Sequence, residues 1–107
     1  MFQQLQEIMT ENAMVSRSEE GLTSALTRIK ELTDQLNPQP VSDVSLAVRT
    51  RRLSAQLETA SSILWAELLR RESRGSHFRT DFPIQDPALD RRILIKKDAS
   101  GIHADFE

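Results

Sequence analysis

An apolar stripe runs through the middle of the chain from residue 46 to residue 68. Its members recur in steps of three or four: Leu46, Thr50, Leu53, Leu57, Ala60, Leu64 and Leu68. This heptad-like spacing is typical of a helix that packs lengthwise against other helices. The stripe predicts one long helix over 43–73, with Ser42 or Ser45 as its cap and Gly75 just past its end.

Two shorter stripes precede this helix. The first predicts a helix over 2–14, and the second predicts a helix over 17–36 that starts at a capping box, Ser16 to Glu19. Two prolines after Asn37 end the second helix. Three amphipathic helices with short connections bury their stripes together as an antiparallel bundle. The sequence therefore predicts an all-α, spectrin-repeat-like three-helix bundle over 1–75.

The pattern changes after Gly75. Residues 76–90 are irregular and contain Pro83 and Pro87, whereas 93–97 and 102–106 have the composition of two strands in a β-hairpin. Because an isolated hairpin is marginal in water, we expect 76–107 to pack on the bundle or on a missing domain. We count 1–75 and 76–107 as one domain. The first helix begins at Phe2 without a cap, so we expect a piece of a longer protein.

Composition excludes several classes of function. The 107 residues contain no cysteine, three isolated glycines, 5% aromatic residues and a net charge of -2. Disulfides, thiol catalysis, a glycine-rich nucleotide cradle and a nucleic-acid partner are therefore not expected. No apolar run approaches the ~20 residues of a membrane span, and the polar N-terminus is not a secretory signal. His77 and His103 are too few for a metal site.

The stretch 70–83 concentrates charge beside aromatic side chains. Four charged or polar groups lie there next to two phenylalanines: Arg74, His77, Arg79, Asp81, Phe78 and Phe82. Arginine and carboxylate groups form bidentate pairs that tolerate burial better than lysine pairs. The pattern predicts a buried polar network at an interface.

This stretch also resembles a family signature. The succinate dehydrogenase/fumarate reductase flavoprotein and L-aspartate oxidase family has E-S-R-G-x-H-x-R-x-D-[FY]-P near its C-terminal end. The chain matches it at Glu72, Ser73, Arg74, Gly75, His77, Arg79, Asp81, Phe82 and Pro83. Residues 15–22 resemble a second family motif, G-V-x-R-[ST]-x-E-G-L, with Met14 where the family usually has glycine. The resemblance covers about 3–95.

The resemblance implies a role within a larger enzyme. The family's last domain is a three-helix bundle packed against FAD-binding and capping domains. The implied parent moves a hydride between a flavin and a C4 dicarboxylate, or oxidises L-aspartate, in the cytoplasm or at the cytoplasmic face of a membrane. The dinucleotide fold and the catalytic arginines lie upstream in that family. This segment alone is therefore expected to bind no FAD and to catalyse nothing.

The resemblance and the charge pattern together predict an interdomain surface. Its members are Glu72, Arg74, His77, Phe78, Arg79, Asp81 and Phe82. Without the partner domains, we expect Arg74, His77, Arg79 and Asp81 to be more exposed and less fully paired than a finished protein would leave them. Arg74→Ala should then leave the melting temperature of the isolated chain nearly unchanged. Phe78 and Phe82 should form an exposed patch that favours dimerisation of the fragment.

Other functions remain open at this point. The C-terminal domain of an L-aspartate oxidase is the alternative within the same family. A free-standing helical module that binds a protein through the arginine-rich end is the alternative of another class. A small nucleic-acid-binding bundle is weaker, because the net charge is -2.

Overall fold

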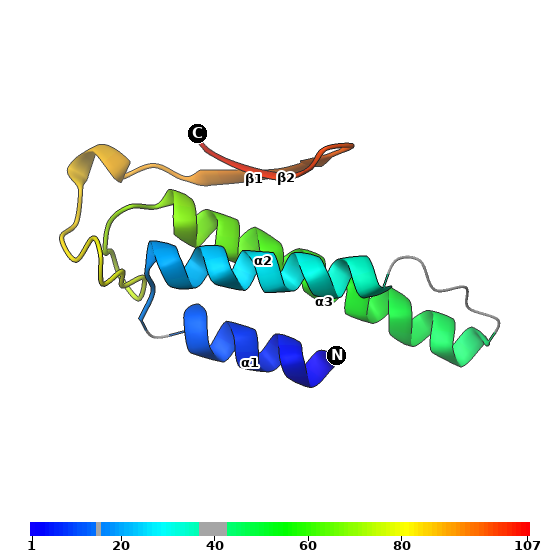
Figure 1. The fold of residues 1–107 in the computed structure, drawn as a ribbon. Coiled ribbons are helices and arrows are strands. Elements are labelled where there is room, and N and C mark those ends of the chain that lie inside the picture. The colour runs from blue at the N-terminus through cyan, green and yellow to red at the C-terminus, as the bar shows by residue number, and fades with distance from the viewer. Residues whose placement is uncertain (15, 37–42) are drawn as a thin grey trace.

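The computed structural model describes residues 1–14, 16–36 and 43–107. Three helices lie side by side and run in alternating directions, and a two-stranded antiparallel hairpin lies alongside the third helix (Figure 1). The elements are α1 (Phe2–Asn12), α2 (Glu19–Leu36), α3 (Val44–Leu69), the 3-10 turn η1 (Pro87–Leu89), β1 (Ile93–Asp98) and β2 (Gly101–Phe106). The predicted three-helix bundle with a terminal hairpin is confirmed.

The core lies between the three helices, with α2 in contact with both neighbours. The buried apolar residues repeat at helical spacing: Leu5 and Ile8 on α1; Leu22, Ala25, Ile29, Leu32 and Leu36 on α2; Leu57, Ala60 and Leu64 on α3. Leu57 is 1% exposed and Leu64 is 0% exposed, as the stripe predicted. Each leucine or isoleucine among them contributes roughly 1.5–3 kcal/mol on burial.

The beginning of α3 differs from the prediction. Leu46 belongs to the predicted stripe, yet it is 50% exposed. The first turns of α3 extend beyond the end of α2, so none of the described helices covers this part of the stripe (Figure 1). The packed face of α3 therefore begins near Leu53, which lies partly buried against the core.

The helix caps also differ from the predicted ones. Ser18, not Ser16, caps α2: its Oγ accepts a hydrogen bond from the Gly21 amide at 3.1 Å. The Asp43 carboxylate caps α3 by accepting from the Ser45 amide at 2.9 Å. The other proposed cap, Ser42, and the Asn37–Pro40 stop lie outside the described residues. Helix α2 nevertheless ends at Leu36 as predicted.

Helix α3 ends at Leu69, four residues before the predicted end at 73. Arg70 already has extended backbone angles, φ -81° and ψ 93°. Gly75 does have a positive φ of 58°, but it is the first loop residue of a tight turn in which Arg74 and His77 exchange both backbone hydrogen bonds. A positive φ at that position is the requirement of a type II′ turn. The glycine therefore reverses the chain after the helix instead of ending the helix.

The hairpin packs on α3. Strands β1 and β2 pair from Ile93 with Phe106 to Asp98 with Gly101, and an ion pair joins Lys97 to Glu58 of α3. The Phe106 ring lies under two guanidinium groups, those of Arg70 and Arg91, at 5.3 and 5.7 Å. These contacts hold the hairpin against the end of the bundle. None of the described helices has the length and apolar character that a bilayer crossing requires.

Candidate functional site

The Glu72 carboxylate is the centre of the first polar cluster after α3. It is fully buried and accepts from Arg70 Nη1 at 2.6 Å, from Arg74 Nε at 3.1 Å and from Arg74 Nη2 at 3.2 Å. The Asp86 amide donates a fourth hydrogen bond at 2.9 Å. Burial alone would raise the pKa of Glu72, but these hydrogen bonds outweigh burial and lower the pKa from 4.5 to about 2.

The two arginines of this cluster reach further along the chain. Arg70 donates to the backbone carbonyls of Leu89 at 2.7 Å and Arg91 at 2.6 Å. Arg74 donates to the Asp86 carbonyl at 3.1 Å and lies 3.4 Å from a carboxylate oxygen of Asp90. The Glu72 cluster therefore fixes the path of the irregular segment that leads to the hairpin.

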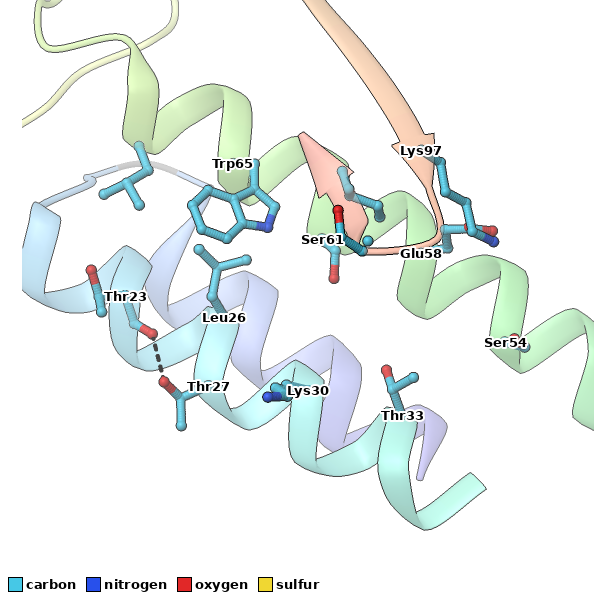
Figure 2. Close-up of a pocket in the computed structure, with 14 residues that line it drawn as sticks. Thr23, Leu26, Thr27, Lys30, Thr33, Ser54, Glu58, Ser61, Trp65 and Lys97 are labelled. Carbon is cyan, nitrogen blue, oxygen red and sulfur yellow. Dashed lines mark hydrogen bonds and ion pairs between the residues drawn. The ribbon is translucent and has the colours of Figure 1, made fainter. Parts of the chain in front are cut away.

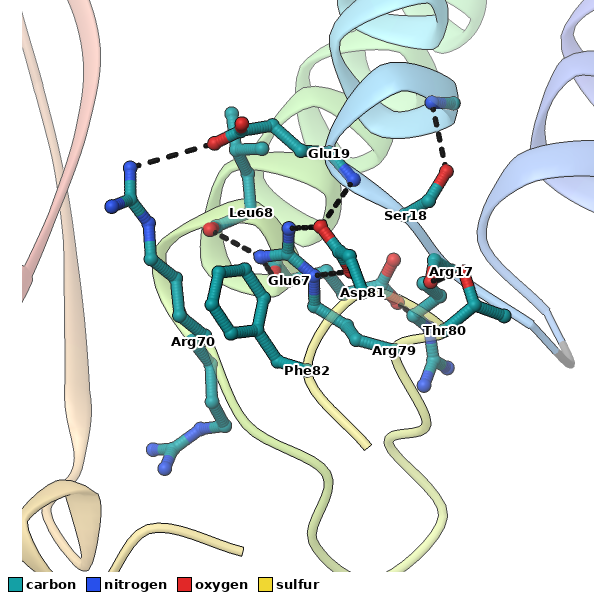
Figure 3. Close-up of polar contacts among 12 residues, drawn as sticks. Arg17, Ser18, Glu19, Glu67, Leu68, Arg70, Arg79, Thr80, Asp81 and Phe82 are labelled. Atoms are coloured by element: carbon teal, nitrogen blue, oxygen red, sulfur yellow. Dashed lines mark hydrogen bonds and ion pairs between the residues drawn. The ribbon is translucent and has the colours of Figure 1, made fainter. Parts of the chain in front are cut away.

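Arg79 is the centre of the second cluster, and its side chain is fully buried. It forms a bidentate pair with Asp81: Nε donates to Oδ1 at 3.0 Å and Nη2 donates to Oδ2 at 2.6 Å (Figure 3). Its Nη1 donates to the Leu68 carbonyl at 2.8 Å. The Phe82 ring centroid lies 4.9 Å from the guanidinium carbon. A positive side chain thus binds the negative C-terminal end of α3.

Asp81 connects this cluster to the start of α2. Its Oδ2 accepts from the Glu19 amide at 3.0 Å, so the carboxylate lies at the positive N-terminal end of that helix (Figure 3). The backbone adds to the connection, because Arg17 donates to the Phe78 carbonyl at 3.0 Å and accepts from the Thr80 amide at 2.7 Å. The Arg79–Asp81 pair therefore joins the end of α3 to the beginning of α2.

His77 lies half-buried beside a third arginine, Arg17. Arg17 Nη1 lies 3.2 Å from His77 Nδ1, and His77 Nε2 lies 3.1 Å from the Arg70 carbonyl. Since Arg17 can only donate, Nδ1 accepts and Nε2 carries the proton. Burial, together with three nearby arginines, lowers the pKa of His77 below 6.5, against a smaller rise from the Arg70 hydrogen bond. His77 is therefore a neutral, doubly hydrogen-bonded side chain.

Glu67 of α3 faces the same arginine. Its Oε1 lies 3.0 Å from Arg17 Nε, while its Oε2 is buried and has no hydrogen-bond partner among the described residues. Burial raises the pKa of Glu67 from 4.5 to about 7, although the charge and hydrogen bond of Arg17 oppose the rise. The Arg17–Glu67 pair ties the connection between α1 and α2 to α3.

A serine, a histidine and an aspartate also meet at the hairpin turn, but they do not form a catalytic triad. Ser100 Oγ lies 2.9 Å and Asp98 Oδ1 lies 3.1 Å from the same atom, Nε2 of His103. A triad histidine uses one ring nitrogen for each partner, so that it can take a proton from the serine while the aspartate holds the other nitrogen. Ser100 also donates directly to Asp98 at 2.6 Å. The cluster therefore stabilises the turn.

The comparisons with known proteins identify the family. Residues 2–101 match the model described as the fumarate reductase flavoprotein C-terminal domain. The chain belongs to this family. It is 37% identical over 98 residues to a chain of the fumarate reductase (CoM/CoB) of Methanothermobacter marburgensis, with 88% of this chain and 18% of the relative covered. It is 38% identical over 88 residues to the L-aspartate oxidase of Rhodospirillum rubrum, with 82% and 27% covered.

A solved structure has the same fold. A mutant of Escherichia coli quinol fumarate reductase superposes with a TM-score of 0.84 at 22% sequence identity, with 92% of this chain and 18% of that chain covered. The chain thus spans 18–27% of the length of these family members. It is the C-terminal domain of a flavoprotein of the fumarate reductase, succinate dehydrogenase and L-aspartate oxidase family.

Some of the predicted site residues of this family domain are buried in the structure, and others are exposed. The expectation that its charged groups are exposed and incompletely paired is wrong for Arg79, which is buried and bonded within the chain. Glu72 is likewise buried and bonded, and Arg74 pairs with it. Arg74→Ala is therefore now expected to destabilise the chain itself, because it removes two hydrogen bonds from a buried carboxylate. Phe78 and Phe82 are 43% and 36% exposed.

Sequence reasoning missed four residues of the network: Arg17, Glu67, Arg70 and Asp86. One signal for Arg70 was present. Arg70, Glu72 and Arg74 alternate at every second position, and residues two apart share one side of an extended chain but not of a helix. This alternation argues against a helix through 73. Arg79 and Asp81 show the same spacing. No such signal pairs Arg17 with Glu67, which are 50 residues apart.

The free energy of unfolding of this domain is expected to fall in acid, over a pH range set by the pKa of Glu72. Its pKa is about 2 in the folded chain and 4.5 ordinarily. The stability that it contributes is therefore complete above pH 4.5 and is lost as the pH falls from 4.5 to about 2. Glu72→Gln, which does not ionise, should remove this part of the pH dependence. Urea unfolding at a series of acidic pH values measures it, and parallel pH profiles for both proteins would contradict the role of Glu72.

Proposed function

We propose that this domain belongs to an FAD-dependent oxidoreductase of the succinate dehydrogenase/fumarate reductase flavoprotein class. Its role there is structural: it docks on the FAD-binding and capping domains of the same chain. The match to the C-terminal family model over residues 2–101 carries the proposal. The enzyme would act in the cytoplasm or at the cytoplasmic face of a membrane.

The residues of this domain do not fit FAD. Binding of a dinucleotide pyrophosphate needs a glycine-rich turn at a helix N-terminus, and Gly21, Gly75 and Gly101 are isolated from one another. The buried arginines that could hold a phosphate already bind Glu72, Asp81 and backbone carbonyls. The flavin and the redox chemistry are therefore assigned to the rest of the polypeptide.

We keep the interdomain role of the 72–82 stretch as part of this proposal, and its exposed members would make the contact. Phe78 and Phe82 offer apolar surface, and the partly exposed edge of Arg74 offers charge. The two parts 1–75 and 76–107 would dock as one domain. Two contacts between them support this unit: Glu72 accepts from the Asp86 amide, and Lys97 pairs with Glu58.

An L-aspartate oxidase is the second candidate, since the relative from Rhodospirillum rubrum is 38% identical over 88 residues. The two candidates differ in the substrate of the whole enzyme, not in this domain. A free-standing interaction module is the candidate of another class. It would be favoured if the full gene product began near Met1, whereas the flavoenzyme would have a long polypeptide before this residue.

Purification of the full gene product tests the proposal. It is expected to carry one FAD and to reduce fumarate or oxidise succinate, or else to oxidise L-aspartate, which decides between the two candidates. The 107-residue chain purified in parallel should be colourless and inactive in all three assays. A full gene product without flavin, or a 107-residue chain that retains FAD, would contradict the proposal.

A further inference from the structure

A groove of about 680 Å³ opens between α2, α3 and the tip of the hairpin (Figure 2). Leu26 of α2, Trp65 and Leu68 of α3, and Ile102 of β2 form its apolar lining. Leu26 and Leu68 are only partly buried by the core, and Trp65 remains 41% exposed. A tryptophan that projects into an open groove is the side chain most often found as an energetic anchor of protein interfaces.

The groove also carries one unbalanced positive charge. Lys97 at its hairpin edge pairs with Glu58 of α3. Lys30 on the α2 edge is exposed and forms no ion pair with a carboxylate in the described ranges 1–14, 16–36 and 43–107. A partner that fills the groove would therefore bring an apolar surface to Trp65 and a carboxylate to Lys30.

We infer that this groove is the main docking surface for the rest of the flavoprotein polypeptide. The inference rests on the proposed function, and it specifies which face of the domain makes the contact. The chain spans only 18% of its Methanothermobacter relative, so a large body of polypeptide in such a protein is available to cover the groove. The groove also adjoins the proposed interface at Leu68, whose side chain lines it and whose carbonyl binds Arg79.

The rest of the domain surface fits this role less well. Glu72 and Arg79 are buried, and both of them and Asp81 already have hydrogen-bond partners within the domain. Phe82 already covers the Arg79 guanidinium. The exposed apolar residues at the start of α3, Val44 and Leu46 among them, adjoin residues 37–42, which lie outside the described part of the chain.

Oxidative footprinting of Trp65 tests the inference. Brief exposure to hydroxyl radicals, followed by peptide mass spectrometry, measures how fast this side chain is oxidised in the 107-residue chain and in the full gene product. Because Trp65 is 41% exposed in the isolated domain, it should be oxidised readily there. In the full gene product at low concentration, its oxidation should fall several-fold.

Charge reversal supplies the matched control. Lys30→Glu in the full gene product should restore much of the Trp65 oxidation, whereas Lys96→Glu, at an exposed hairpin residue that does not line the groove, should not. Neither change should alter the melting temperature of the 107-residue chain. The inference is overturned if Trp65 is oxidised equally in both proteins, if Lys30→Glu leaves its protection intact, or if protection requires a separate polypeptide or high concentration.

A flavin-loaded protein with exposed Trp65 would overturn only this inference, whereas a flavin-free protein would overturn the proposed function.

Discussion

Replacing Arg79 with methionine is expected to lower the free energy of unfolding of the 107-residue chain by about 1.5–3 kcal/mol. The arginine is fully buried, so its loss leaves the Leu68 carbonyl without its side-chain donor and leaves Asp81 with the Glu19 amide but without the guanidinium. Methionine has a similar length and keeps the apolar packing, so that the loss reports on the hydrogen bonds. Urea denaturation followed by circular dichroism measures it.

Arg71→Met is the matched control. Arg71 is 63% exposed, and its one ion pair joins it to Glu19 at 3.4 Å. Exposed pairs of this kind contribute at most about 1 kcal/mol, so this change should have little effect. Equal losses for Arg71→Met and Arg79→Met would show that the hydrogen bonds of the buried arginine have no special role.

Leu64→Ala is expected to cost about 2–5 kcal/mol, because it leaves a cavity where α3 packs on the core. Leu64 is 0% exposed, whereas Leu46 on the same helix is 50% exposed. Leu46→Ala should therefore cost much less, although both residues belong to one sequence stripe. Thermal unfolding of the two variants measures the difference, and a loss below about 1 kcal/mol for Leu64→Ala would mean that the core face is wrongly assigned.

The bundle could be predicted because its signal is local. Steps of three and four put Leu22, Ile29 and Leu36 on one face of α2, and the same steps put Leu57 and Leu64 on one face of α3. Helix ends were less predictable. Leu46 fits the spacing of the apolar stripe, but none of the described helices packs on it. The relative lengths of α2 and α3 decide which part of the stripe is buried.

The sequence could predict where the polar network lies, but not which carboxylate each arginine binds. The composition of 70–83 indicated buried arginine–carboxylate pairs, and those pairs exist. The assignment of the arginines' partners to another domain was an inference from the resemblance and the charge density, and neither of these says which carboxylate each arginine reaches. Arg79 binds the end of α3 only because the turn at Gly75 reverses the chain toward it.

The residues of the 72–82 stretch could have served both to stabilise this domain and to dock it on another. Their hydrogen bonds within the chain indicate the first role. The Glu72 and Arg79 clusters hold the end of α3, the start of α2 and the irregular segment in one unit. Under the proposed function, docking would then involve exposed side chains such as Trp65 and Phe78. A signature of this kind can therefore characterise a family through the stability of its last domain rather than through catalysis.

The most direct test of this closed network is to measure the effect of Arg79→Met in two proteins, the 107-residue chain and the full gene product. If the arginine stabilises its own domain, the unfolding transition of this domain should shift by a similar free energy in both, about 1.5–3 kcal/mol. An isolated chain that melts unchanged, with the loss confined to the full gene product, would show that Arg79 acts at the interdomain surface, and would contradict the account.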